Sequence, residues 1–162
     1  MKLAILILED ETEVRNAIER DLMGFSSALR IETAEDVADA WEVINEIDAD
    51  GDVLALAVCD HRMPGTTGIE FMGQMMEDER TALTRKILLT GQASLTDTIR
   101  AVTDAGLDQY VAKPWKAPEL QEVVRSLLTD YIELAEIEPM PYLGVLDPQR
   151  AMQIARHHSV AD

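Results

Sequence analysis

The sequence VLALAVCD at residues 53–60 is apolar up to its last residue, Asp60. A short and continuous apolar run of this kind is typical of a strand that is buried on both faces of a parallel sheet. The loop DHRMPGTTG opens at Asp60, so the strand presents a carboxylate at its carboxyl end. Ligands of open α/β sheets bind outside the carboxyl ends of the strands, and Asp60 is therefore a candidate nucleophile or metal ligand.

Similar apolar segments alternate with helical patterns over the first 130 residues. We expect strands at residues 3–8, 29–33, 53–59, 86–90 and 108–112. Five β-α repeats predict a parallel, doubly wound α/β sheet, because right-handed crossovers place helices on both of its faces. Among such folds we favour the flavodoxin-like strand order 2-1-3-4-5 for this five-stranded sheet.

This strand order brings three acids together. The first strand runs directly into Glu9 and Asp10, as the third runs into Asp60. In the order 2-1-3-4-5 the first and third strands are neighbours at the switch point of the sheet. We therefore expect Glu9, Asp10 and Asp60 to converge on one crevice.

Two helices have recognisable start signals. The second is predicted to begin at Thr33, whose hydroxyl can cap it, with Asp36 three residues later as the acidic end of a capping box. The fourth is predicted to begin likewise at Ser94 with Asp97, and Gly106 is placed to end it in the left-handed conformation.

The fifth helix, which starts near Pro118, carries apolar residues spaced four and three apart. They are Leu120, Val124, Leu127, Tyr131 and Leu134. Such spacing fits a coiled-coil seam, but it equally fits a helix that packs on the sheet up to Leu128 and then continues over the surface.

The last part of the chain is predicted to be a short appendage. Glu138-Pro139 is expected to end the fifth helix, and Asp147-Pro148 to start a final helix that reaches about His157. We therefore divide the chain into a domain of residues 1–130 and a helical extension or linker of residues 131–162. The extension is too short for a DNA-binding or nucleotide-cyclase domain. It fits a dimerisation element, a partner-recognition tail, the stub of a linker cut from a longer regulator, or a tail folded back on the fifth helix.

The composition restricts the classes of partner. Fourteen basic and 31 acidic residues give a net charge of −17, which disfavours binding to nucleic acids and to anionic membranes. Cys59, the only cysteine, lies in an apolar strand and is expected to be a buried small hydrophobe. No stretch approaches the roughly 18 apolar residues of a membrane span, and the initial apolar run is too short for a signal peptide. We expect a cytoplasmic protein.

An acidic crevice requires a cation. Two carboxylates about 4 Å apart repel each other by roughly 4 kcal/mol at an effective dielectric constant near 20. A few hard carboxylate oxygens suit Mg²⁺, which keeps several of its waters and commonly bridges one or two acids to a phosphate. Glu9 and Asp10 also fit a structural role as acids facing the N-terminus of the helix that starts near Thr12, but this role does not explain Asp60.

Two further strand ends supply a hydroxyl and a cation. The fourth strand ends at Thr90, and Lys113 follows the fifth. Taken singly, Thr90 fits an ordinary strand residue and Lys113 fits a solvated loop charge. Their arrival at successive strand ends beside three acids favours a shared site.

At this point the chain resembles the receiver domain of two-component response regulators, including the single-domain chemotaxis type. The resemblance covers residues 1 to about 130 and rests on five elements in order. These are Glu9-Asp10, Asp60 with Met63-Pro64-Gly65 and Gly68, Thr90-Gly91, Tyr110, and Lys113-Pro114.

The resemblance implies a phosphorylation switch. Asp60 would be the phosphoacceptor, taking a phosphoryl group from a phosphohistidine of a histidine kinase or phosphotransfer protein. Mg²⁺ would be bound by Asp10 and Asp60, by Glu9 mainly through water, and by the backbone carbonyl of Arg62.

The remaining family positions have roles after phosphorylation. Lys113 and the Thr90 hydroxyl would contact the phosphoryl oxygens. Thr90 and Tyr110 would then move and change the surface of helix 4, strand 5 and helix 5, where downstream proteins dock. The downstream target is not specified by these residues, and a homodimer is compatible with them.

Other functions fit less well. Haloacid-dehalogenase-type phosphatases also use an aspartate nucleophile with Mg²⁺, but they require a second Asp two residues later, where this chain has Arg62. A dinucleotide-binding domain lacks support because no G-x-G-x-x-G follows the first strand. We expect a regulatory domain rather than an enzyme, either acting alone or as the receiver of a larger signalling protein.

Overall fold

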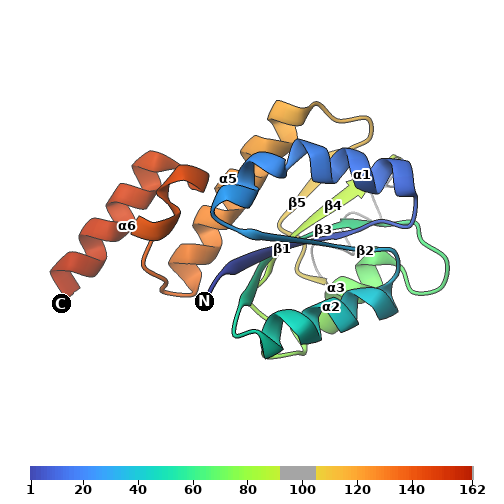
Figure 1. The fold of residues 1–162 in the computed structure, drawn as a ribbon, viewed down its shortest axis with the longest axis horizontal. Helices are drawn as coiled ribbons and strands as arrows, with labels where there is room; N and C mark the ends of the chain where they lie inside the picture. The colour runs from blue at the N-terminus through green and yellow to red at the C-terminus, as the bar shows by residue number, and fades with distance from the viewer. Residues whose placement is uncertain (92–104, 162) are drawn as a thin grey trace.

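The computed structural model describes residues 1–91 and 105–161 of the chain (Figure 1). The strands are β1 (Leu3–Leu8), β2 (Arg30–Ala34), β3 (Val53–Asp60), β4 (Arg85–Thr90) and β5 (Gln109–Ala112). The α-helices are α1 (Thr12–Asp21), α2 (Val37–Ala49), α3 (Gly68–Met76), α5 (Ala117–Leu134) and α6 (Pro148–Ala161). Two 3-10 helices, η1 (Met23–Ser27) and η2 (Met140–Val145), follow α1 and α5.

The five strands form one parallel sheet in the order β2-β1-β3-β4-β5. The predicted fold class and strand order are therefore confirmed. The register aligns the strand ends, because Leu8 pairs with Cys59 and Asp60 pairs with Leu89. Thr90 pairs in turn with Ala112, the last residue of β5. The residues that complete or directly follow four neighbouring strands thus come together at one edge of the sheet.

Side chains of the sheet alternate between two apolar layers, which the helices cover (Figure 1). Ile5 and Ile7 of β1 pack in the layer beneath α1 and α5, whereas Leu6 and Leu8 pack in the layer beneath α2 and α3. Because β1 is buried on both faces, its sequence is apolar without interruption, as is typical of a central parallel strand.

The start of α2 differs from the prediction. Asp36, not Thr33, is the N-cap, and its carboxylate accepts a hydrogen bond of 2.7 Å from the backbone N–H of Asp39. Thr33 does not cap the helix because it is still part of β2, where it pairs with Ile7. The predicted start of the fourth helix at Ser94 lies outside the described residues.

The two other predicted helix ends have mixed outcomes. Gly106 has a φ of 66° directly after the helical Ala105, as predicted for a residue that ends a helix. Helix α5 ends at Leu134, earlier than the predicted Glu138-Pro139. The chain leaves the helical path at Glu136, whose φ is 55°.

The apolar stripe of α5 packs inside the molecule. Leu120, Val124, Leu127 and Tyr131 are buried in the layer that covers β1, β3 and β4, and Leu134 is about half exposed. The stripe therefore forms part of the chain's own core, in agreement with the packing alternative up to Leu128.

The extension folds back on α5 (Figure 1). Tyr142, Val145, Leu146, Ala151 and Ile154 are buried in the same apolar cluster as Leu128 and Ile132. The N–H groups at the start of α6 are capped as predicted, because an Asp147 oxygen accepts a hydrogen bond from the backbone N–H of Arg150 at 3.0 Å. The division at residue 130 stays a prediction, and α5 itself continues across it.

Polar contacts reinforce the packing of the extension. The guanidinium of Arg125 donates to the carbonyls of Gly144 and Leu146, and the Thr129 hydroxyl accepts from the backbone N–H of Asp147. The carbonyl groups and N–H groups of the connecting segment thus gain partners from α5. Within residues 1–91 and 105–161, no helix is long and apolar enough to cross a membrane.

Candidate functional site

Three acids meet at the carboxyl edge of the sheet. One carboxylate oxygen each from Glu9, Asp10 and Asp60 lies within 4.8 Å of the other two. Glu9 and Asp60 are buried, and Asp10 is partly buried. Their proximity follows from the register of β1 and β3, in which Leu8 and Cys59 are paired.

Lys113 lies between two of these acids. Its Nζ is 3.0 Å from Oε1 of Glu9 and 3.0 Å from Oδ1 of Asp60. Burial of the ammonium lowers the pKa of Lys113, but its hydrogen bonds to Asp60 and Glu9 outweigh this and hold the pKa above its usual value. The lysine is therefore a permanent cation of the crevice. Its backbone is held as well, because the Lys113 N–H donates to the Thr90 carbonyl at 2.9 Å.

Glu9 has an unusual environment for a carboxylate. Burial, and next its hydrogen bond with Asp60, raises the pKa of Glu9 to about 7, although Lys113 acts in the opposite direction. Its Oε2 accepts a hydrogen bond of 3.0 Å from the backbone N–H of Asp10, and its carbonyl accepts one of 2.8 Å from Arg15. Hydrogen bonds thus hold both the carboxylate and the backbone carbonyl of Glu9, and burial makes the ionised form of its side chain unfavourable.

Asp10 provides a test of whether a cation fits. Its Oδ1 is buried and has no hydrogen-bond partner among the described residues. Buried polar atoms are usually paired, so an unpaired carboxylate oxygen beside two other acids fits a cation ligand. Three hard oxygen donors with only one neighbouring lysine are the ligand set that Mg²⁺ prefers. The residues present therefore fit this ion.

An open hollow of about 320 Å³ lies beside the acids. It is lined by Glu11, Asp60, Arg62, Thr90, Gly91 and Lys113. Thr90 is buried, whereas the Arg62 side chain is exposed at the rim. The hollow gives a reactant access to Asp60 between a hydroxyl and an ammonium group.

Two residues contribute to the site more than their sequence patterns suggested. Glu11, which precedes α1, lines the hollow, although in the sequence it is only the third of three consecutive acids. Gly68 starts α3 against the backbone of Asp60, and a Cβ atom at this position would lie 2.1 Å from the Asp60 carbonyl oxygen. The loop after Asp60 therefore requires glycine here for space.

Other predicted residues lie outside the acidic cluster. The Tyr110 side chain is 50% exposed on β5, and Tyr110 is not among the residues that line the hollow. The Arg62 side chain reaches the hollow, but a metal contact by its carbonyl stays a prediction. The crevice thus unites Glu9, Asp10, Asp60, Thr90 and Lys113, and it leaves Tyr110 at the surface.

Comparisons with known proteins agree with this geometry. The sequence pattern of the response regulator receiver domain matches residues 5–125. The hydrogenase transcriptional regulatory protein HoxA of Cupriavidus necator is 31% identical over 121 residues, which cover 75% of this chain and 23% of HoxA. The phosphate regulon transcriptional regulatory protein PhoB of Escherichia coli is 27% identical over 147 residues, which cover 89% of this chain and 60% of PhoB.

A solved structure supports the fold. The chain superposes with a TM-score of 0.72 on the signal receiver domain of an HD domain-containing protein from Pseudomonas fluorescens, at 19% identity. The match covers 83% of this chain and 93% of that domain. By contrast, this chain spans less than two thirds of the length of HoxA or of PhoB.

Proposed function

The chain belongs to the response regulator receiver domain family, and from this premise we propose that it is a phosphorylation-controlled regulator whose phosphoacceptor is Asp60. The observation that carries the proposal is the position of Lys113, whose Nζ lies 3.0 Å from both Asp60 and Glu9. This arrangement holds the carboxylate of Asp60 in a hollow that is open to a reactant and places a cation where phosphoryl oxygens would arrive.

The chemical step is a phosphoryl transfer from a phosphohistidine. A carboxylate oxygen of Asp60 forms a new P–O bond with its own electron pair, and the P–N bond of the donor breaks. The electron pair of that bond leaves with the imidazole, which takes up a proton from solvent. No general base is needed, because a carboxylate oxygen supplies the attacking electron pair itself. The protein contributes positioning and charge neutralisation, which are its main tasks in such transfers.

The oxygens of the transferred group need partners. Lys113 provides an ammonium group, and the Thr90 hydroxyl provides a hydrogen-bond donor from the end of β4. Glu9, Asp10, Asp60 and the carbonyl of Arg62 would hold Mg²⁺, which when bound supplies positive charge to the phosphoryl oxygens. The unpaired Oδ1 of Asp10 supports this assignment.

Phosphorylation is proposed to act through Thr90 and Tyr110. The modification adds roughly −1.5 to −2 charge and three acceptor oxygens to a crevice in which Thr90 is buried. We expect the Thr90 hydroxyl to move towards these oxygens and the Tyr110 ring, half exposed at present, to turn into the space released. The surface around β5 and α5 would change and be read by a downstream protein.

The partners follow from the chemistry. A histidine kinase or phosphotransfer protein supplies the phosphoryl group in the cytoplasm. HoxA and PhoB are named as transcriptional regulatory proteins and are longer than this chain. This supports the second form of the proposal, in which the chain is the receiver of a larger signalling protein.

The first experiment measures covalent labelling. Incubation with a small acyl phosphate and Mg²⁺ is expected to add one phosphoryl group to the protein, detected by intact mass. Asp60→Asn abolishes the mass increase, and chelation of Mg²⁺ prevents it. Glu11→Gln is the matched control, because Glu11 lines the same hollow but is not part of the acidic cluster. A mass increase that persists in Asp60→Asn overturns the assignment.

A second measurement tests the metal without any reaction. Mg²⁺ is expected to raise the thermal denaturation temperature of the wild type and of Glu11→Gln, but not that of Asp10→Asn. An equal effect on all three proteins would remove the proposed metal site.

The phosphatase alternative is tested in the same solution. Continuous release of phosphate from a phosphomonoester would assign a turnover enzyme, whereas a receiver is labelled once and loses the group slowly.

A further inference from the structure

The helix layer formed by α2 and α3 carries a strongly one-sided charge. Residues 35–50 contain seven acids and residues 68–80 contain four, and the single basic residue in these two segments is Arg80. The segments are adjacent in the fold, because α2 and α3 cover the same face of the sheet (Figure 1). A partner that approaches this layer therefore meets a negative surface, which selects cationic partners.

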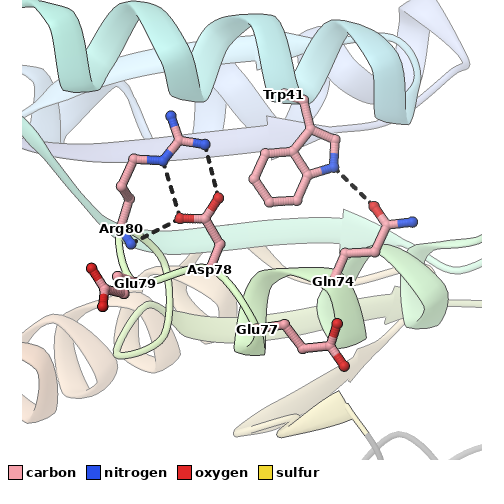
Figure 2. Close-up of a pocket in the computed structure, with 6 residues that line it drawn as sticks. All are labelled: Trp41, Gln74, Glu77, Asp78, Glu79 and Arg80. Carbon is pink, nitrogen blue, oxygen red and sulfur yellow. Dashed lines mark hydrogen bonds and ion pairs between the residues drawn. The ribbon is translucent and has the colours of Figure 1, made fainter.

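A groove between α2 and the end of α3 has an aromatic wall. We call it the Trp41 groove; it has a volume of about 610 Å³ and is lined by Trp41, Gln74, Glu77, Asp78, Glu79 and Arg80 (Figure 2). Figure 2 shows the indole reaching from α2 into the space between Gln74 and Asp78.

The indole is held in a fixed position. Its Nε1 donates a hydrogen bond of 2.9 Å to Oε1 of Gln74. Its ring packs edge-on against the Phe71 ring, with the two ring centroids 5.5 Å apart. The indole N–H is therefore already satisfied, and its ring surface is what the Trp41 groove offers to a ligand.

The charged residues of the groove differ in whether they form ion pairs. Arg80 donates hydrogen bonds to both oxygens of Asp78 and a further one of 2.8 Å to Asn45 of α2. Asp78 and Arg80 thus neutralise each other and form a rigid wall (Figure 2). Glu77 and Glu79 are exposed, and neither forms an ion pair with any residue in the described ranges. Glu77 and Glu79 line the same groove as the fixed indole, so both carboxylates are available to a cationic segment that spans the groove.

A second hollow, lined by both apolar and charged residues, adjoins the Trp41 groove. It measures about 200 Å³ and shares Glu79 and Arg80 with the groove. Its apolar walls include Ile44, Ile47, Val53, Leu54 and Leu83. Leu83 is 46% exposed, so it forms an accessible apolar part of this hollow.

We propose that the Trp41 groove binds a basic segment of a partner protein, with an arginine guanidinium stacked on Trp41 and an apolar neighbour in the adjoining hollow. Guanidinium groups stack on the faces of tryptophan rings, and the exposed carboxylates of Glu77 and Glu79 provide the opposite charge. Val53 and Leu54 at the start of β3 and Thr84 just before β4 line the hollow, so this surface lies towards the opposite end of the sheet from Asp60. The partner would be recognised independently of the phosphorylation crevice.

The test uses a short peptide, acetyl-Gly-Arg-Leu-Arg-Gly-amide, and its analogue with citrulline in place of arginine. The chain has two tryptophans, Trp41 and Trp115, and the Trp115 indole donates its N–H to Asp21 on α1. In an NMR titration we expect the Trp41 indole signal to shift and saturate while the Trp115 signal stays in place. The citrulline analogue, which has the same shape without the charge, is expected to bind about tenfold more weakly.

Two charge variants distinguish a specific binding site from nonspecific electrostatic attraction of the peptide. Glu77→Gln is expected to weaken the peptide about threefold, whereas Glu122→Gln, an equal loss of charge at an exposed position of α5, leaves the affinity within the error of calorimetry. Trp41→Leu keeps an apolar side chain against Phe71 and is expected to weaken peptide binding about as much as Glu77→Gln does. Circular dichroism checks that this variant is folded. Glu77→Gln leaves labelling of Asp60 unchanged, so failure of this proposal and failure of the phosphoacceptor proposal are distinguishable.

Three outcomes overturn the proposal. Equal effects of Glu77→Gln and Glu122→Gln would show that only net charge attracts the peptide. Equal binding of spermidine would show that the planar guanidinium is not recognised. A dimer seen by light scattering and lost in Glu77→Gln would assign the surface to a second copy of this chain.

Discussion

The crevice formed by Glu9, Asp10 and Asp60 and the Trp41 groove are both lined by acids, but their carboxylates differ in exposure to water. In the crevice Glu9 is fully buried, and its pKa is raised to about 7. In the groove Glu77 and Glu79 are exposed to water. The comparison teaches that a cluster of carboxylates stores electrostatic energy only where the fold removes water, because solvent screens exposed charges.

The cations of the two regions differ in the same way. Lys113 is enclosed between Glu9 and Asp60, with 23% of its side chain exposed, whereas Arg80 and Asp78 form a pair at the surface. Removing the partner of a buried charge is costly, while an exposed pair contributes little. Each of the following changes tests whether this contrast is real, beginning with the largest expected effect.

Gly68→Ala is expected to cause the greatest loss of stability. The new Cβ would meet the Asp60 carbonyl oxygen at 2.1 Å, so α3 or the strand end must move. We expect a loss of about 3 kcal/mol or more in urea denaturation, as for other overpacked sites. The control is Gly73→Ala in the same helix, where no atom lies within 4 Å of the added Cβ. That change is expected to stabilise the protein by about 0.5–1 kcal/mol, and a similar loss in both variants would contradict the steric argument.

Lys113→Met is expected to have the second largest effect. Without the ammonium, the buried Glu9 and Asp60 face each other uncompensated, and we expect the metal-free protein to lose about 2 kcal/mol at pH 8. Addition of Mg²⁺ is expected to recover part of this loss. Urea denaturation with and without Mg²⁺ measures both effects, and an unchanged stability at pH 8 would show that the crevice is better hydrated than its burial indicates.

Glu9→Gln tests the pH dependence of the crevice. The pKa of Glu9 is raised from 4.5 to about 7 in the folded protein, so the folded state binds the proton more tightly than the unfolded state. Ionisation of Glu9 therefore removes stability from the wild type as the pH rises through the range 4.5 to 7. The metal-free variant is expected to match the wild type near pH 4 and to exceed it by about 1–2 kcal/mol at pH 8.

The control for this pH profile comes from the other region. Glu77→Gln is expected to leave the profile unchanged between pH 4 and pH 8, because its carboxylate is exposed. A gain in Glu9→Gln that is already complete at pH 4 would contradict the raised pKa.

Arg80→Gln is expected to have the smallest effect. The change breaks a surface pair whose members are 34% and 28% exposed, and we expect a loss of about 0.5 kcal/mol that shrinks further in 1 M salt. Thermal denaturation at two salt concentrations measures it. A loss as large as that of Lys113→Met would remove the distinction between the two regions.

Much of the fold was predictable because its signals are local. The strands predicted at 3–8 and 53–59 are continuous apolar runs followed by acids, and the structure has β1 at Leu3–Leu8 and β3 at Val53–Asp60. Once the strand order is known, the residues at the ends of β1 and β4 are expected beside Asp60, because these strands flank β3. The same reasoning placed Thr90 and Lys113 at the ends of the adjacent strands.

The errors of prediction occurred where local signals compete with tertiary pairing. Thr33 has a side chain that can cap a helix, but its backbone pairs with Ile7 in the sheet, so Asp36 caps α2 instead. Nothing in the sequence indicated that Gly68 faces the Asp60 carbonyl, since that approach depends on the path of the whole loop. The apolar spacing of α5 was likewise compatible with two packings, and the position of the extension decided between them.

The sequence by itself determined which chemical groups stand at the ends of which strands, because an apolar run and the polar residue that ends it are neighbours along the chain. Only the tertiary structure decided that Lys113 bridges Glu9 and Asp60, that an oxygen of Asp10 is buried without a partner, and that Trp41 forms one wall of a groove. These features depend on distances of a few ångströms between segments far apart in the sequence. Such distances are set by strand register and helix packing, which depend on contacts between elements that are distant in the sequence.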